Sequence, residues 1–403
     1  MIYIDLNAPI FSSQLDKFLI NPTGGEFFGL AMIATLLPFF FIKPLNINCY
    51  RTVKIKLIDK NAVFLIAIAF ITALYADLVF KGVYPVFQGM ERYEYRDQFA
   101  GPMTLFLFKY GQLIMALLGG CLVWPSLKGR GLDLKFIVPI ILIFIYLFII
   151  SVRFSGYFSF FSFLVLPLGA LLLRKSRKNP GVSPYLVPKK LIVSGIVIIS
   201  ILSGISIINS YTSRVTKNIA KIENVNEVIK DRLIERFFVQ QGEMWGETFN
   251  RLFLGNVDSR EEALYFMFVE PGLGGGDTGI RYLMRASLGA HLEQSLYEDG
   301  VQYAGGYPES IFEMSGAILA YPIIIILNVF FALFMIFGAK NFNKGRAYTA
   351  FFSVYVYFAM SAMYTSGTFT FLVAWTFWVK VALLALCYSI ESGKLRLPQG
   401  VPN

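Results

Sequence analysis

Apolar runs long enough to cross a membrane recur along most of the chain. The hydrocarbon core of a bilayer is about 30 Å thick, which a helix of about 20 residues spans. Runs near this length predict about nine transmembrane helices, at Phe27–Ile42, Asn61–Phe80, Met103–Val123, Phe136–Val152, Tyr157–Leu173, Leu191–Ile208, Ala317–Gly338, Thr349–Met363 and Phe369–Ile390. The pattern predicts an all-α, polytopic integral membrane protein.

One stretch interrupts this pattern. Between Ser210 and Ser310 the chain is mostly polar for about a hundred residues, far more than a connection between neighbouring spans needs. We therefore expect N-terminal transmembrane helices over 1–210, a large extracytoplasmic loop over 211–310, and C-terminal transmembrane helices over 311–403. Apolar residues recur at helical spacing from Val215 to Phe237, which predicts an amphipathic helix within the loop, either on the membrane surface or packed over the bundle.

Basic residues predict which side of the membrane the long loop faces. Lys and Arg gather in the segments 43–60, 128–135, 174–190 and 340–346 and in the tail after residue 390. With about nine spans all five lie on one side, and cytoplasmic loops carry an excess of Lys and Arg. The long loop is therefore expected outside. Residues 1–20 lack a charged start followed by an apolar core, so no cleavable signal peptide is expected.

Composition agrees with a membrane protein and narrows the chemistry. The chain is 56% hydrophobic and 15% charged, with a mean hydropathy of +0.60, which excludes an ordinary soluble domain. The net charge of +10 reflects the short basic loops, so no nucleic-acid partner is expected. The cysteines Cys49, Cys121 and Cys387 lie outside the long loop. One histidine and scattered carboxylates give no metal-ligand spacing, so we expect no metal.

Two segments mix aromatic and hydrogen-bonding side chains in a way that suits sugars. An aromatic face covers the C–H surface of a pyranose, while amides and carboxylates bind its hydroxyls. The segment QQGEMWGETF of the long loop offers Gln241, Glu243 and Trp245. The outer loop after the second predicted span, KGVYPVFQGMERYEYRDQFAGP, adds Arg92 and Tyr95.

A glycine-rich segment of the long loop, GLGGGDTGIRYLMR, predicts a turn that opens a helix at about Thr278. Its glycine spacing also matches a dinucleotide fingerprint. We do not expect a dinucleotide site, because no strand precedes the segment and the loop faces outward. Arg281 and Arg285 fall one turn apart on the predicted helix, and a helix N-terminus with two arginines is a good pyrophosphate receptor. The alternative is that these arginines pair with Asp277, Glu293 or lipid headgroups.

Candidate proton acceptors lie in the same loop. His291, the only histidine of the chain, has an ordinary pKa near neutrality, although a lone loop histidine is often structural. Glu293 and Glu309 compete for the role, as do other acidic residues, namely Glu298, Asp299 and Glu313. Glu309 and Glu313 are one helical turn apart in GGYPESIFEMSG. Gly289 interrupts the expected helix before His291, so its convergence with the arginines does not follow from the sequence.

Ionisable residues also occur within or beside the apolar segments. Arg153, in the hairpin SVRFSGYFSFF, either extends to lipid headgroups or binds the phosphate of a lipid-linked substrate. Asp77 and Lys109 both lie toward the outer side of predicted spans, where they are candidate partners.

The arrangement of spans and loops resembles the O-antigen polymerases, or oligosaccharide repeat-unit polymerases, of bacterial surface-polysaccharide pathways. The likeness rests on GVYPVF, the hairpin RFSGYF, the loop motifs QQGEMW and GGDTGIRYLMR, and GGYPESIFEMSG before the closing spans. It implies an inner-membrane glycosyltransferase that acts without a cofactor on the periplasmic side. The growing glycan passes from undecaprenyl pyrophosphate to the next lipid-linked unit.

The resemblance also implies site residues and partners. The outer arginines Arg153, Arg281 and Arg285 would bind pyrophosphate. Lipid-linked oligosaccharides and membrane lipids, with a chain-length regulator and a flippase of the same pathway, would be the partners. Two alternatives remain open: a flippase or transporter for the same lipid-linked sugars, and an O-antigen ligase. A transporter often shows repeated halves, of which this sequence has no sign. A ligase differs mainly in its acceptor.

Overall fold

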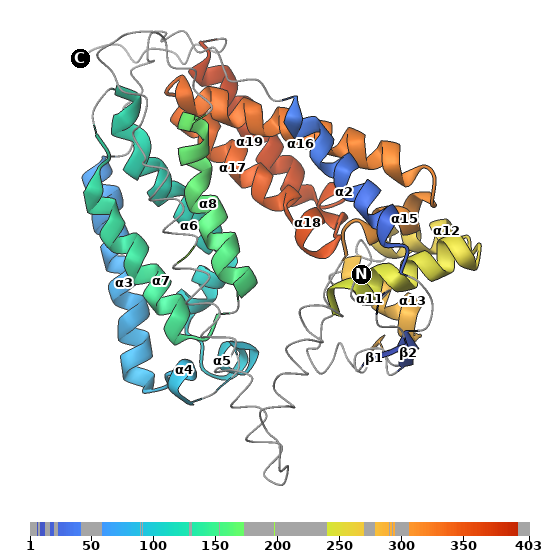
Figure 1. Ribbon diagram of the computed structural model, residues 1–403. Coiled ribbons are helices and arrows are strands. Elements are labelled where there is room, and N and C mark those ends of the chain that lie inside the picture. The colour runs from blue at the N-terminus through green and yellow to red at the C-terminus, as the bar shows by residue number, and fades with distance from the viewer. Residues whose placement is uncertain are drawn as a thin grey trace. The chain divides into compact units, whose positions relative to one another are not determined.

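The computed structural model of the protein describes residues 6, 9–12, 17–19, 23–41, 59–88, 90, 92–128, 131–152, 154–172, 197, 240–269, 279–289, 291, 293–294 and 306–393. Within these ranges the chain is helical apart from one small antiparallel pair of strands, β1 (Ile10–Ser12) and β2 (Lys17–Leu19). The register pairs Ile10 with Leu19 and Ser12 with Lys17. The predicted helical class is confirmed (Figure 1).

The chain separates into two compact units by its contacts. Unit 1 comprises Met1–Ile42, Asn226–Ile336 and Val356–Leu383, and unit 2 comprises Lys43–Val225, Phe337–Tyr355 and Leu384–Asn403. The three parts expected from the sequence therefore stay a prediction, while the contacts group the start of the chain with much of the long loop. The expected helix over 215–237 and the expected span over 191–208 lie outside the described residues.

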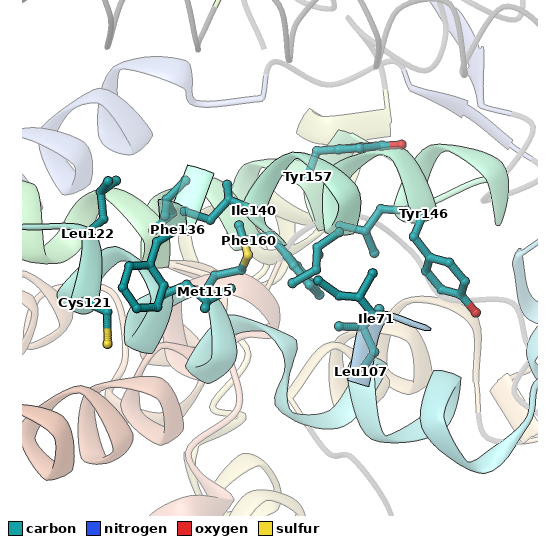
Figure 2. Close-up of a cluster of buried hydrophobic side chains, with 14 of the residues drawn as sticks. Ile71, Leu107, Met115, Cys121, Leu122, Phe136, Ile140, Tyr146, Tyr157 and Phe160 are labelled. Atoms are coloured by element: carbon teal, nitrogen blue, oxygen red, sulfur yellow. The ribbon is translucent and has the colours of Figure 1, made fainter. Parts of the chain in front are cut away.

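The first part of unit 2 is a bundle of helices that contact one another. Its elements are α3 (Lys60–Lys81), α4 (Pro85–Gln88), α5 (Arg92–Gln98), α6 (Pro102–Val123), η1 (Trp124–Lys128), η2 (Leu134–Phe136), α7 (Ile137–Ile149) and α8 (Phe154–Leu172). Helix α6 contacts α3, α7 and α8. Figure 2 shows side chains of these helices meeting in one buried cluster, among them Ile71, Met115, Ile140 and Phe160.

Two glycines set the close approach of α6 and α8. A Cβ atom on Gly111 would lie 2.2 Å from the ring of Phe160, and one on Gly119 would lie 2.5 Å from the carbonyl oxygen of Leu164. Helices in a membrane gain little from hydrophobic association, so small residues that permit tight packing are the usual means of contact. The close packing at these glycines is joined by one hydrogen bond between the helices, which Gln112 Nε2 of α6 donates to Ser159 Oγ of α8 at 3.3 Å.

The sequence-based pairing of Asp77 with Lys109 is wrong. Asp77 forms an ion pair with Lys81, one turn later on α3, at 2.9 Å. The ammonium group of Lys109 lies 5.4 Å from the ring centroid of Tyr110 instead. Residues four apart on one helix are neighbours on its surface, so Lys81 can reach Asp77 without any contact between helices.

Unit 1 contains a second cluster of buried hydrophobic side chains. Besides β1 and β2, its elements before residue 316 are α2 (Gly25–Phe40), α11 (Gln240–Phe249), the π-helix η4 (Asn250–Leu254), α12 (Arg260–Leu264), the π-helix η5 (Tyr265–Val269), α13 (Gly279–Leu288) and α15 (Glu309–Ser315). Helix α15 contacts α11, α12 and α13. Segments that were predicted to form the outer loop therefore share a packed helical core with side chains of α2 and of the closing helices.

The closing helices belong partly to each unit. They are α16 (Ala320–Asn343), α17 (Ala347–Met360), α18 (Ala362–Ser366), η7 (Thr370–Leu372) and α19 (Trp375–Glu391). Three helical segments of the described chain are long and apolar enough to cross a membrane, at Lys60–Gln88, Pro102–Ser126 and Ala320–Asn343. Shorter apolar helices lie at Gly25–Phe40, Leu134–Ile149 and Gly156–Ala170. These helices support a membrane protein.

Candidate functional site

Three glycines bring backbone segments together where α13 begins. The predicted helix start at about Thr278 agrees with α13, which begins at Gly279. A Cβ atom on Gly279 would lie 2.4 Å from the carbonyl oxygen of Ser366, and one on Gly367 would lie 2.0 Å from that of Gly306. Gly306 and Gly367 also have φ angles of +120° and +62°, which favour glycine. The start of α13, the turn before α15 and the end of α18 are thus fixed against one another.

Arg281 is held by acidic and amide side chains that follow α13. Its Nε donates to a carboxylate oxygen of Glu293, and its Nη2 donates to Oε1 of Gln294 at 2.8 Å. The Glu293 side chain is buried. The pairing of Arg281 with Glu293, one of the alternatives from the sequence, is therefore present in the structure. The positive charge of Arg281 is compensated within the protein.

Arg285, one turn later, has a different environment. Its guanidinium carbon lies 5.3 Å from the ring centroid of Phe266, on η5, in a cation–π contact. It makes no ion pair with any carboxylate in the described part of the chain. The half-buried guanidinium is thus positioned by an aromatic ring.

Helix α15 carries two buried carboxylates one turn apart. The Glu309 side chain is 1% exposed, and its Oε2 accepts a hydrogen bond from the backbone N–H of Gly306 at 3.2 Å. Glu313 is fully buried and pairs with Arg251 of η4, while Ser259 Oγ donates to its Oε2 at 2.5 Å. Burial raises the pKa of Glu309 from 4.5 to about 7, and the charge of Glu313 adds to the rise.

Hydrogen bonds between distant segments anchor the turn that leads to Glu309. The hydroxyl of Tyr307 shares a hydrogen bond with Thr35 of α2 at 2.6 Å and accepts one from Asn328 Nδ2 of α16 at 2.9 Å. The Tyr364 hydroxyl of α18 donates to Asn328 Oδ1. Side chains from α2, α16 and α18 therefore fix the residue two positions before Glu309.

His291 follows the end of α13. Helix α13 ends at Leu288, and Gly289 has a φ angle of +86°, so the chain changes direction where the sequence had suggested a break. His291 is exposed. Its part in proton transfer stays a prediction.

Two residues of unit 1 that were predicted to bind sugar, Glu243 and Trp245, are buried. Trp245 is fully buried, with its ring between those of Phe28 and Phe312 at centroid distances of 5.4 and 5.0 Å. The indole is therefore a core side chain and lacks the open face that sugar stacking requires. Glu243, on the same helix, is also fully buried. The side chain of Gln241 lies outside the described residues.

The remaining sugar and phosphate candidates belong to unit 2. Tyr95, on α5, is fully buried, again without an open ring face. The side chain of Arg92 on the same helix and the whole of Arg153 lie outside the described residues. The predictions for Arg92 and Arg153 are therefore neither supported nor contradicted by a contact.

The contacts of Glu313 were not anticipated from the sequence. Arg251 lies 62 residues before Glu313, and no periodic pattern connects the two. Ser259 begins a Ser-x-x-Glu pattern that usually signals a capping box at a helix start. It does precede α12, but its hydroxyl makes no cap and donates to Glu313. The motif therefore indicates the start of α12 but does not predict the contact between Ser259 and Glu313.

Comparison with known families bears on the second half of the chain. Residues 274–381 are similar to a family of unknown function, DUF6418. The match includes α13 and α15 with Arg281, Arg285 and Glu309, and excludes Arg251. Comparison with curated proteins and with solved structures found no match.

Proposed function

We propose that the protein is a bacterial inner-membrane glycosyltransferase that polymerises lipid-linked oligosaccharide repeat units into a surface polysaccharide. It has about nine transmembrane helices and an active site on the periplasmic face. Its donor is a growing glycan on undecaprenyl pyrophosphate, and its acceptor is a hydroxyl of the next lipid-linked unit. Membrane lipids, a chain-length regulator and a flippase of the same pathway are its partners.

The observation that carries the proposal is the contact between α13 and α15. It brings two arginines one turn apart, Arg281 and Arg285, into the same compact unit as the buried carboxyl of Glu309. Transfer of a glycan from a pyrophosphate needs cationic groups for the leaving group and a group that takes the acceptor's proton. Unit 1 contains both kinds of group.

Arg281 and Arg285 have different roles in binding the donor. Arg285 has no carboxylate partner in the described ranges and is oriented by Phe266, so it is the better candidate for direct contact with pyrophosphate. Arg281 is compensated by Glu293 and fixes the segment after α13. In the reaction, the bond between the anomeric carbon and the pyrophosphate oxygen breaks, and the negative charge that develops on this oxygen is stabilised by Arg285.

Glu309 is the best supported of the candidate proton acceptors. A general base is most effective when its pKa lies near the working pH, and burial raises the pKa of Glu309 to about 7. Glu293 is already paired with Arg281, and His291 is exposed. The acceptor oxygen forms the new bond to the anomeric carbon as its proton passes to the Glu309 carboxylate.

A strain that lacks the gene tests this function against its two alternatives. Electrophoresis of its surface glycan is expected to show a single repeat unit on the lipid anchor and no longer chains. Loss of every repeat unit would contradict polymerisation and point to a flippase or a ligase. Re-expression of the wild-type gene should restore the long chains, which controls for effects on neighbouring genes.

Variants of two arginines in unit 1 then test the site. Arg285→Ala is expected to leave the single-repeat pattern at normal protein level. Arg260→Ala is the matched control, because Arg260 is exposed and pairs with Asp258, next to it on the surface. Equal chain-length distributions in the two variants would contradict the role of Arg285.

A further inference from the structure

The two carboxylates of α15 differ in how the protein compensates them. Glu309 and Glu313 are four residues apart and therefore share one face of the helix. Both are buried, so each ionised form must be stabilised by the protein or avoided. Two equivalent buried carboxylates at this spacing would compete for one proton. The two carboxyls, however, have different hydrogen-bond and ion-pair partners.

Glu313 is equipped to remain an anion. Arg251 donates to its Oε1 from η4, and Ser259 donates to its Oε2 from the start of α12. The Ser259 hydroxyl also lies 3.3 Å from the Glu313 carbonyl oxygen. Two separate elements thus hold both carboxylate oxygens, an arrangement that stabilises charge in a buried site.

Glu309 has much weaker compensation. Its hydrogen bonds come from backbone N–H groups, that of Gly306 at 3.2 Å and its own, and it forms no ion pair within the described ranges. The elements that pack against α15, together with η4, carry these titratable or charged groups: Glu243 and Glu247 on α11, Arg251 on η4, Arg260, Glu261 and Glu262 on α12, Arg281, Tyr282 and Arg285 on α13, Tyr321 in the first turn of α16, and Tyr364 on α18. The charge that acts on Glu309 is that of Glu313, on its own helix.

We infer that Glu313 is a positioning residue for Glu309: Arg251 and Ser259 hold Glu313 as the anion of the pair, which makes Glu309 the carboxyl that binds and releases a proton. Pairs of carboxyls whose environments separate their protonation in this way are typical of acid–base sites. The catalytic meaning of this pair rests on the proposed function. The separation itself is a property of the resting protein.

Infrared spectroscopy of the purified full-length protein tests the separation without any substrate. The carbonyl stretch of a protonated carboxyl is followed against pH, and the band that disappears in Glu309→Gln is assigned to Glu309. Glu313→Gln is expected to lower the midpoint of this band by about one pH unit, because a nearby negative charge is lost. Glu261→Gln, an exposed change on α12, is the control and should leave the midpoint unchanged. An unchanged midpoint in Glu313→Gln overturns the inference.

A second variant decides the matter if Glu313→Gln does not fold. Arg251→Gln removes the cation but allows Glu313 to become neutral by binding a proton, so no charge stays buried and unpaired. We expect a second protonated-carboxyl band at neutral pH, which is absent in the wild type. If no second band appears, Arg251 does not hold Glu313 as an anion and the inference fails.

The pH profile of polymer formation connects the pair to catalysis. In membranes supplied with lipid-linked repeat units, wild-type activity should rise with pH through about 7, as Glu309 loses its proton. Glu313→Gln should move this rise to lower pH by the same shift as the infrared midpoint. A purely structural role for Glu313 would lower activity at every pH without moving the profile, and that result contradicts a positioning role. Absence of polymer at every pH in the wild type would refute the proposed function alone.

Discussion

Replacement of Glu309 by glutamine is expected to stabilise the folded protein at alkaline pH. Glu309 is 1% exposed, and within the described residues the structure provides only backbone N–H groups and no cation to its carboxyl. Glutamine has nearly the same shape and carries no charge. The substitution therefore removes the free-energy cost of a buried anion with little change in packing.

The magnitude follows from the pKa of Glu309 in the two states. Its carboxyl ionises near 4.5 in the unfolded chain and near 7 in the folded protein. Below pH 4.5 the carboxyl is protonated in both states, so it costs nothing. Between these values the folded state binds more protons than the unfolded state, and stability falls as pH rises. At about 1.4 kcal/mol per unit, the total loss above pH 7 is about 3 kcal/mol.

Unfolding of the purified protein in detergent, measured across this pH range, tests the prediction. The unfolding free energy of Glu309→Gln minus that of the wild type should grow by about 3 kcal/mol from acid to alkaline pH. Groups common to both proteins cancel in this difference. Glu261→Gln should give a constant difference, because Glu261 is exposed. A pH-independent difference for Glu309→Gln would refute the reasoning.

Two further predictions concern packing in unit 1. Trp245→Ala should lower the unfolding free energy by about 3–5 kcal/mol, since it empties a fully buried site. Trp375→Ala, at a side chain 74% exposed, should change it little, and similar thermal-denaturation midpoints for the two variants would contradict the core assignment. Gly279→Ala should destabilise the protein by more than about 1 kcal/mol, because the new methyl group meets the Ser366 carbonyl, whereas Gly29→Ala in open space on α2 should be neutral or stabilising. Equal melting temperatures for these two alanine variants would disprove the close approach at α13.

Continuous apolar runs gave reliable positions for several helices. The predicted segments Asn61–Phe80 and Met103–Val123 correspond to α3 (Lys60–Lys81) and α6 (Pro102–Val123), since the length of an apolar run directly reflects the thickness to be crossed. The closing segments were harder to predict. The expected run Thr349–Met363 divides into α17 and α18, and Gly367 ends the latter with a positive φ angle. Hydropathy does not report such breaks.

Local signals in the site were more informative than distant ones. A helix was predicted from about Thr278 and α13 is described from Gly279, and the pair Arg281–Glu293 was among the alternatives because its members are near in sequence. The pair Arg251–Glu313 could not be predicted, because it joins two short helices whose packing no periodicity encodes. The role of Trp245 could not be predicted for a different reason.

An aromatic residue among polar neighbours has the same sequence pattern whether it binds sugar or fills a core. The burial of Trp245 follows from the rings of Phe28, on α2, and Phe312, on α15, which lie far from it in the sequence. Only the tertiary packing distinguishes the two roles.

The central claim is that this protein joins lipid-linked repeat units. Its most direct test uses purified protein in liposomes that contain a single-repeat lipid-linked oligosaccharide, with products separated by size. The wild type and Arg260→Ala should convert single repeats into products of two or more, and Arg285→Ala should not. If the wild-type protein leaves every oligosaccharide at one repeat, or only moves it across the bilayer, the proposed polymerase activity is contradicted.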